Sequence, residues 1–173
     1  MSNDPNDDDF DLDEFLADSD ALLDEDPYAV VTLDRARGDE LPSHVKIEDV
    51  GVEISMYLGW AIDTRLVSDE LETRCQPLLD QFRARTTHSR EILSKCCDNK
   101  LEIPHLSDKG NEFTRCYYRP GWSHFYYEDL GKRFPDLDDF AYLADTWENY
   151  DIVRDMIHRR FEEWMKEDKR RRS

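Results

Sequence analysis

Glycine is scarce in this chain, and the positions of its six glycines exclude the common phosphate-binding loops. They stand at 38, 51, 59, 110, 121 and 131, so neither G-x-G-x-x-G nor the P-loop pattern occurs. The five histidines show no H-x-x-x-H or H-x-H spacing, and no G-x-S-x-G elbow is present. A catalytic site needs an activated nucleophile, a metal cluster or a phosphate cradle, and the sequence predicts none of these. We therefore expect no enzyme activity, no cofactor and no metal.

Basic residues and long apolar runs are also in short supply. The chain has 23 Lys and Arg against 41 Asp and Glu, a formal charge of −18. An acidic surface repels nucleic acid and anionic membranes, so we expect neither as a partner. No run of about 18 apolar residues is present to cross a bilayer. The first residues carry acids where a secretory signal carries positive charge, so we expect a cytoplasmic location.

Cysteine is used four times, at positions 75, 96, 97 and 116. No two of them form a C-x-x-C pair, and the adjacent Cys96 and Cys97 cannot chelate a metal as spaced ligands do. All four fall inside predicted helices, where a free cysteine behaves as a small hydrophobe. We therefore predict four reduced thiols in the core.

The uneven spread of charge predicts four segments. Residues 1–27 hold ten Asp and two Glu without any Lys or Arg, a charge of −12, whereas the remaining 146 residues hold 23 basic and 29 acidic side chains. Like charges this dense repel one another, which predicts a disordered acidic arm over 1–27. Residues 28–45 form a connector with a short β-like run at 28–33, residues 46–168 a helical domain, and residues 169–173 a basic tail.

Apolar residues interrupt the acidic arm at helical spacing. Leu12, Phe15 and Leu16 fall at i, i+3 and i+4, the spacing of one helical face. Alternation of acidic and apolar residues is typical of segments that fold on binding. A solvated tail that only improves solubility is the alternative interpretation.

The rest of the chain shows helical periodicity throughout. Apolar residues recur at three and four from Ile47 to Ile62, and Asp69 with Glu72 forms a cap-like pair for a second helix that Pro77 should kink or divide. A third helix begins after Thr87 or Ser89. Further helices are predicted after Ser107 and over 123–134, with one more turn within 136–145.

The final helix has the clearest pattern in the chain. An aromatic and aliphatic stripe steps by three or four through Trp147, Tyr150, Val153, Ile157, Phe161 and Trp164. Asp145 or Thr146 is its predicted cap. Asp145 and Glu148 are interpreted as acids at a helix N-terminus rather than as a catalytic pair. The predicted fold class is all-α, a compact bundle of about five to six helices.

Six aromatic residues lie within eleven positions, at 117, 118, 122, 125, 126 and 127. Such a cluster can stack bases, but single-strand platforms lie in basic grooves, and the neighbouring basic residues here are matched by acids. We expect some of these rings in the core and one or two at a protein interface, where Tyr and Trp are over-represented.

Several short strings resemble a bacterial family of unassigned name whose members act as immunity proteins, encoded beside polymorphic or type VI secreted toxins. The matching strings lie between Val50 and Trp164 and occur in the family's order. They are residues 57–62 (YLGWAI), 66–68 (LVS), 97–101 (CDNKL), 106–113 (LSDKGNEF) with Tyr117-Tyr118, and 145–150 (DTWENY) with Arg160-Phe161 and Trp164. The arm lies outside this resemblance, and no functional residues are carried over from it.

The resemblance implies a protein that captures an incoming toxin, with a nuclease as the expected kind. Charge complementarity would speed the encounter and buried aromatic anchors would slow release. An acidic helical surface would occlude the basic active site of such a toxin. The residues expected to bind the partner are Tyr126, Tyr127, Glu128, Asp129, Asp136, Asp138 and Asp139.

The alternative function is a non-enzymatic adaptor or regulator that uses the acidic arm as a binding peptide. Inhibition by plugging the toxin's active site and inhibition by holding the toxin in an inactive shape are both compatible with the sequence.

Overall fold

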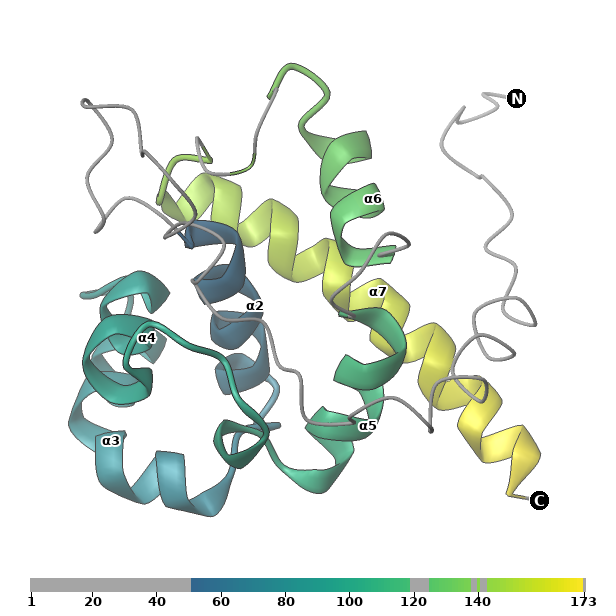
Figure 1. The fold of residues 1–173 in the computed structure, drawn as a ribbon, viewed down its shortest axis with the longest axis horizontal. Coiled ribbons are helices and arrows are strands. Elements are labelled where there is room, and N and C mark those ends of the chain that lie inside the picture. Colours follow the sequence, from purple (N-terminus) through teal and green to yellow (C-terminus); the bar gives the residue numbers. More distant parts are fainter. Residues whose placement is uncertain (1–50, 119–124, 138–139, 141–142, 173) are drawn as a thin grey trace, which may run out of the picture.

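The computed structural model describes residues 51–118, 125–137, 140 and 143–172 of the chain. Over these ranges the protein is all-α, with six α-helices and no β-strand, so the predicted fold class is confirmed (Figure 1). The acidic arm, the connector and the β-like run at 28–33 lie outside the described residues. The elements are α2 (Val52–Asp63), α3 (Asp69–Arg83), α4 (Ser89–Cys97), the short 3₁₀-helix η3 (Ile103–His105), α5 (Asp108–Tyr117), α6 (Phe125–Arg133) and α7 (Trp147–Arg171).

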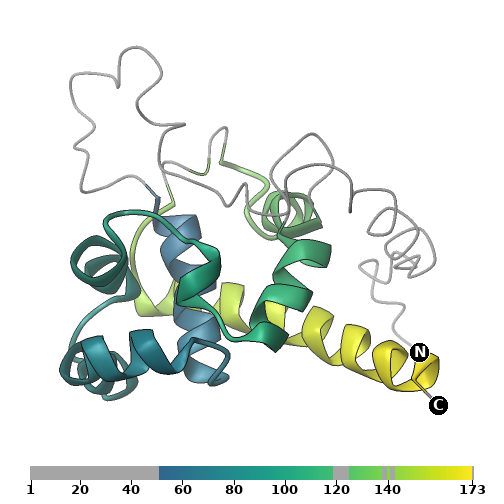
Figure 2. The same cartoon turned by 60° about the horizontal axis from the view of Figure 1, so that its bottom comes forward.

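The long helix α7 packs against α2, α5 and α6. Helix α2 crosses it near the middle of the molecule, α3 and α4 lie on one side of α2, and α5 and α6 lie on the other (Figure 1). In Figure 2 the last turns of α7 extend past α5 and the other described helices. Within the described ranges no helix has an apolar stretch long enough to cross a lipid bilayer.

Two predicted helix starts are confirmed by their caps. The Ser107 hydroxyl accepts the Gly110 N–H at 3.2 Å and begins α5, and the Thr146 hydroxyl accepts the Asn149 N–H at 3.2 Å and begins α7. Each bond satisfies one of the backbone donors that a helix N-terminus leaves without an intrahelical partner. The two helices that the sequence delimits best are therefore those with a Ser or Thr cap before a strongly periodic run.

The start of α3 was assigned one residue too late. The cap is Ser68, whose hydroxyl accepts the Leu71 N–H at 3.2 Å, and Asp69 is the first helical residue. The acid at Asp69 still favours this helix end, because negative charge near the N-terminus complements the helix dipole. Pro77 lies inside α3, which continues through it to Arg83, so the proline does not divide the helix.

Helix α4 also begins elsewhere than predicted. His88 precedes α4 in extended conformation without a side-chain cap, where Thr87 or Ser89 was expected. The predicted helix start at Ile47 lies outside the described residues, and α2 begins at Val52, directly after Gly51 with φ 82° and ψ 22°. Glycine occupies this left-handed region readily since it carries no Cβ.

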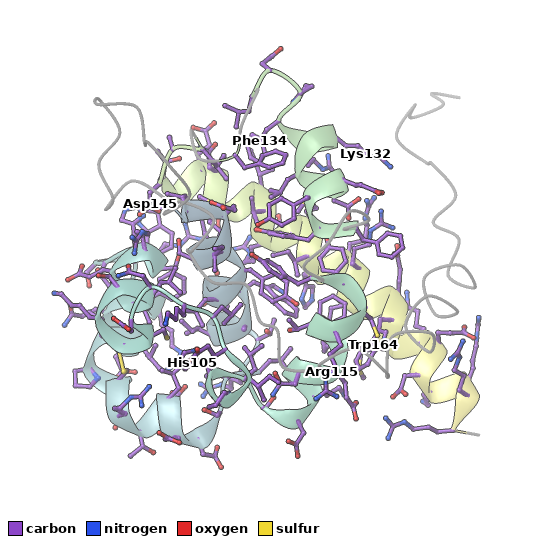
Figure 3. The ribbon with its side chains drawn as sticks, in the orientation of Figure 1. His105, Arg115, Lys132, Phe134, Asp145 and Trp164 are labelled. Carbon is purple, nitrogen blue, oxygen red and sulfur yellow. A yellow bond between two sulfur atoms is a disulfide. The ribbon has the colours of Figure 1, made fainter. Side chains whose placement is uncertain are left out.

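An aromatic cluster fills the space where α2, α5 and α7 meet. The ring centroids of Trp60, Phe113 and Phe161 lie 5.2–5.4 Å from one another. Trp164, labelled in Figure 3, packs on Phe113 at 5.7 Å and on Phe161 at 5.8 Å. Offset and edge contacts at these distances are the preferred aromatic geometries. The stripe predicted for the last helix therefore packs into the core, as its period indicated.

Helix α2 approaches three neighbours closely at Gly59. A Cβ built there would lie 2.8 Å from the Tyr150 ring of α7, 2.9 Å from the Phe82 ring of α3 and 3.1 Å from Ser89 of α4. A side chain at this point would overlap these groups, so the absence of a side chain lets four helices converge.

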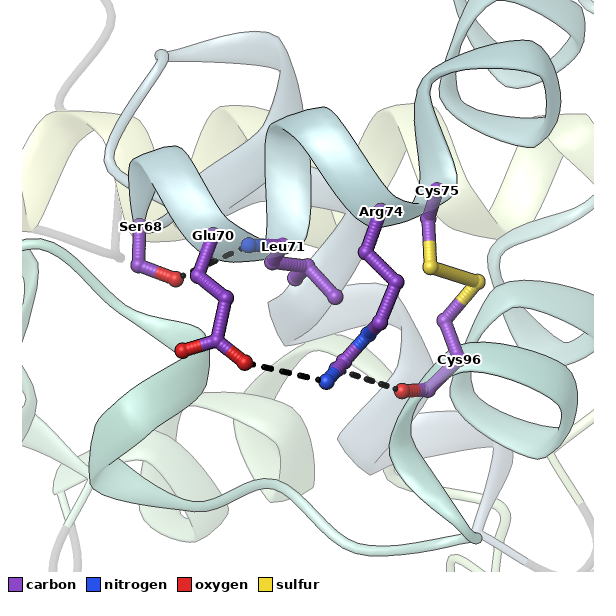
Figure 4. Close-up of a disulfide and its surroundings, with 6 residues drawn as sticks. All are labelled: Ser68, Glu70, Leu71, Arg74, Cys75 and Cys96. Atoms are coloured by element: carbon purple, nitrogen blue, oxygen red, sulfur yellow. Dashed lines mark hydrogen bonds and ion pairs between the residues drawn. A yellow bond between two sulfur atoms is a disulfide. The ribbon is translucent and has the colours of Figure 1, made fainter.

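The prediction of four reduced core thiols is wrong for two of them. Cys75 on α3 and Cys96 on α4 form a disulfide, with their Cα atoms 6.3 Å apart (Figure 4). Arg74 lies beside it and donates to the Cys96 carbonyl at 3.0 Å and to the Glu70 carboxylate at 3.2 Å. The prediction failed because it considered sequence spacing only, whereas helices α3 and α4 fold back on each other and bring the two residues within bonding range. Cys97 is a buried thiol, as expected.

Candidate functional site

Helix α6 divides the predicted partner-binding residues between its two faces. Tyr126 is fully buried and Asp129 is 5% exposed, so the prediction that both belong to the surface is wrong. Both face inward with Leu130, at helical spacings of three and four. Glu128 is exposed and Tyr127 is half-buried.

Asp129 is held by a buried network. Arg160 of α7 donates from Nε and Nη2 to the two carboxylate oxygens, each at 2.8 Å, and the Tyr117 hydroxyl donates to Oδ2 at 2.9 Å. Burial, followed by the charge of Asp129, raises the pKa of Tyr117 well above its usual value, so Tyr117 stays a neutral donor. The pair attaches α6 to α7 and leaves Asp129 unable to meet a partner.

Tyr126 is held in place by α2 and by neighbouring aromatic rings. Its hydroxyl donates to the Glu53 carbonyl of α2 at 2.6 Å, and its ring lies 4.8 Å from Tyr118 and 5.4 Å from Tyr57. Desolvation raises the pKa of Tyr126 well above its usual value. Tyr126 is therefore a core residue, whereas Tyr127 packs at the edge of the same cluster against Phe140 at 5.7 Å.

The described exterior of α6 carries both signs of charge. Glu128 and Asp136 are exposed, and so are Lys132 and Arg133. Asp138 and Asp139, the remaining predicted residues, lie outside the described residues. The acidity of the chain is concentrated elsewhere, since residues 1–50 hold 17 Asp and Glu against 3 Lys and Arg.

A second group of polar and aromatic side chains gathers where α7 begins. The Arg85 guanidinium lies 4.7 Å from the centroid of the Trp147 ring, and the His88 ring lies 4.9 Å from it. His88 Nδ1 is 3.3 Å from Asp145 Oδ1. Burial raises the pKa of Asp145, and the neighbouring His88 opposes that shift. We call Arg85, His88, Asp145, Trp147 and Asp151 the Trp147 cluster.

Asp151 binds two arginines at the Trp147 cluster. Its carboxylate accepts from both terminal nitrogens of Arg85, at 2.9 and 2.5 Å, and from Arg154 at 2.7 Å. The bond from Arg85 is the main cause that lowers the pKa of Asp151. Ile152 stands next in the chain and is 40% exposed.

The composition of the Trp147 cluster suits recognition of another protein. Trp and Arg are enriched among the residues that dominate binding energy at protein interfaces. The side chains of Arg85 and His88 keep 45% and 37% of their surface exposed, so the cluster is accessible to a partner. The ion pairs of Arg85 with Asp151 hold its guanidinium in place before binding, which reduces the entropy lost on association.

Sequence reasoning missed the Trp147 cluster because its members come from separate segments. Arg85 and His88 stand in the loop before α4, and Trp147 begins α7. The one sequence signal for this cluster was the position of Trp147. It is the first residue of a strongly amphipathic helix, where a large ring can reach past the helix end.

Comparison with known proteins places the chain in a family without an assigned activity. Residues 34–143 match the family described as Domain of unknown function (DUF7832). The matched range contains α2 to α6 and leaves out α7 and the acidic arm. No curated protein and no solved structure matches the chain. In the part of the chain that the structure describes, no group of three or more His, Cys, Asp and Glu side chains is arranged to hold a metal ion.

Proposed function

Because the chain belongs to the DUF7832 family, which has no assigned activity to transfer, we propose its function from its own geometry and sequence: it binds and neutralises a cognate antibacterial toxin. The observation that carries the proposal is the Trp147 cluster, in which an accessible arginine packs on an aromatic ring, while Ile152, the residue after Asp151, is exposed on the same helix. The resemblance of residues 57–62 and 145–150 to immunity proteins supports the same function.

Neutralisation inside the producing cell requires slow release of the captured toxin. A residence time that long comes from a few well-packed anchors, each costing about 2 kcal/mol or more when truncated. Trp147 packs against Phe82 at 5.4 Å and against Tyr150 at 5.4 Å, so it is held rigid by the core on one side. A rigid ring of this kind offers contact area at little loss of conformational entropy.

Neutralisation also requires fast capture. In this proposal the acidic residues on α6 and in the segment that follows it supply the attraction. Phe134 and Asp145, both labelled in Figure 3, lie in the upper part of that view, and Asp145 belongs to the Trp147 cluster, so the segment that joins α6 to α7 ends at this cluster. Negative charge at Glu128, Asp136, Asp138 and Asp139 would steer a basic toxin toward this cluster. The expected partner remains a nuclease, whose active site is basic because it binds phosphate.

Binding kinetics with the toxin encoded beside this gene can separate the two contributions. The anchor should act on the dissociation rate, and the acidic residues should act on the association rate. Replacing Ile152, the exposed neighbour of Asp151 in the chain, by Glu places a charge at the proposed interface and should raise the dissociation rate about 30-fold or more, which corresponds to about 2 kcal/mol. Ser94→Glu on the exposed face of α4 is the matched control and should leave that rate unchanged. Equal rates for both variants, with full protection of cells in each case, would contradict the proposed anchor.

Reversal of Asp136, Asp138 and Asp139 to Lys should instead lower the association rate and its dependence on salt, because charges at the rim act mainly on encounter. Unchanged association would remove these acids from the interface.

Deletion of residues 1–27 distinguishes the toxin proposal from an adaptor function. An adaptor that uses the acidic arm as its binding peptide loses its partner on deletion, whereas an antidote working through its helical body keeps protecting. Turnover of a small molecule by the pure protein would overturn both.

A further inference from the structure

The last two turns of α7 carry a concentration of positive charge. Residues 166–172 read KEDKRRR, five basic side chains against two acidic ones. The side chains of Arg170 and Arg172 are 78% and 66% exposed, and Arg171 is exposed as well. We call Lys166, Lys169, Arg170, Arg171 and Arg172 the basic end of α7.

Apolar surface continues from the basic end toward the core. Phe161, Met165 and Lys169 stand at successive intervals of four on α7, which places them along one side of the helix. Phe161 and Met165 are only half-buried, although both pack against the core. The basic end of α7, whose last turns extend past α5 in Figure 2, is therefore bordered along the helix by partly exposed apolar side chains.

The acidic arm has the complementary composition. Residues 1–27 carry twelve acids and no base, interrupted by Leu12, Phe15 and Leu16 at the spacing of one helical face. An amphipathic acidic segment can place apolar residues against Phe161 and Met165 while its carboxylates meet the basic end. No other stretch of this chain combines twelve acids with apolar residues at that spacing.

The intervening chain is long enough for this contact. Residues 28–50 separate the arm from Gly51, and 23 residues span up to about 75 Å when extended. Helix α7 has 25 residues and is therefore about 37 Å long. The connector can thus span the whole length of α7 from any starting point on the helical body.

We propose that residues 1–27 dock on the basic end of α7 of the same molecule, with Phe161 and Met165 as the apolar part of the contact. A tethered segment acts at an effective concentration on the order of 1 mM. A weak intrinsic affinity of about 100 µM therefore suffices for about tenfold occupancy of the docked over the undocked state. This inference is independent of the toxin proposal, because both docking partners belong to this chain.

Zero-length cross-linking of the full chain tests the contact. A carbodiimide joins a lysine amine to a carboxylate in contact with it, and the arm has no lysine of its own. Mass spectrometry should find arm carboxylates linked to Lys166 and Lys169 about tenfold more often than to the exposed Lys95 of α4. The yield should fall several-fold in 1 M salt, where the Debye length is about 3 Å. Links distributed among all lysines alike would overturn the proposal.

Charge reversal gives the matched comparison. Arg170→Glu, Arg171→Glu and Arg172→Glu together keep both lysines but should lower the yield of arm cross-links several-fold. The same change of net charge made at the exposed Arg65, Arg133 and Arg159 should leave the yield unchanged. Equal yields in the two triple variants would refute docking on the basic end. A yield that rises with protein concentration would also refute it, because it would indicate contact between two copies.

Discussion

Replacing Asp129 by Ala should destabilise the protein far more than loss of an ordinary ion pair. Asp129 and Arg160 have side chains only 6% and 9% exposed, and two bonds of 2.8 Å join them. Removing one member of a buried pair costs about 3–5 kcal/mol, because the other charge stays buried without compensation. Glu163 lies 3.3 Å from Arg160 and is 34% exposed, so it compensates part of that charge. We therefore expect about 3 kcal/mol, the lower end of the range.

Urea denaturation followed by circular dichroism measures this loss. With a slope of about 2 kcal/mol per molar urea, a loss of about 3 kcal/mol lowers the midpoint by about 1.5 M without changing the slope. The matched control is Glu70→Ala, which removes the partner of Arg74 in a pair whose side chains are 73% and 49% exposed. An exposed pair contributes less than about 1 kcal/mol. A loss for Asp129→Ala that equals this control would refute the buried-charge reasoning.

Replacing all three members of the buried network by apolar residues separates the attraction between the charges from the cost of removing these charges from water. Asp129→Leu, Arg160→Met and Tyr117→Phe together leave no buried charge and no buried hydroxyl of the network without a partner. Apolar replacement of a complete buried ion pair is often neutral or stabilising. The triple variant should therefore unfold at a higher urea concentration than Asp129→Ala, even though it lacks more of the native bonds. A triple variant less stable than Asp129→Ala would contradict this account.

Three further outcomes follow from the described contacts. Replacing Cys75 and Cys96 by Ser should lower the free energy of unfolding by about 3 kcal/mol, since the disulfide closes a loop of 21 residues, and a thiol assay on the denatured wild-type chain should count two thiols and not four. Burial lowers the pKa of His105. The stabilising contribution of His105 is therefore present above the pKa of the unfolded chain, about 6.5, and is lost as pH falls through the lower pKa of the folded protein. In a His105→Gln variant, the urea midpoint should depend less on pH below about 6.5. Gly59→Ala should destabilise by about 1–3 kcal/mol through overlap with its neighbours, whereas Gly131→Ala, whose Cβ meets only Phe140 at 3.8 Å, should be neutral or stabilising by up to about 1 kcal/mol in the same denaturation assay.

The sequence predicts the helices well where apolar period and cap agree. Helix α7 shows both, with a stripe through Phe161 and Trp164, and its Thr146 cap is one of the two adjacent residues predicted for it. Helix α2 shows the period alone, and its first described helical residue, Val52, follows the left-handed Gly51 at a position that periodicity does not mark. A periodic apolar stripe predicts which face of a helix is buried. The residue at which the helix begins depends instead on the backbone conformation of a single residue.

The candidate site was less predictable, because a run of acidic residues in the sequence was treated as one surface, although its members lie on different faces of a helix. Asp129 belongs to the inner face with Tyr126 and Leu130, three and four positions apart, and Arg160 stands on the apolar stripe of α7 between Ile157 and Trp164. Two opposite charges, each on an apolar face, predict a buried pair, and this signal was present in the sequence. The disulfide and the Trp147 cluster depend on which helices become neighbours, which no local pattern contains.

Helix α7 follows the other described helices in the chain, and this order has a consequence for how the protein is made. Trp60 and Phe113 find their ring partners in Phe161 and Trp164, roughly fifty to one hundred residues later. During synthesis the earlier helices therefore emerge with apolar faces open, and α2, α3 and α4, which pack on one another, can associate before the rest. Nascent chains stopped before Phe161 should be the form that chaperones and proteases engage, and final closure of the core must wait for α7 to leave the ribosome.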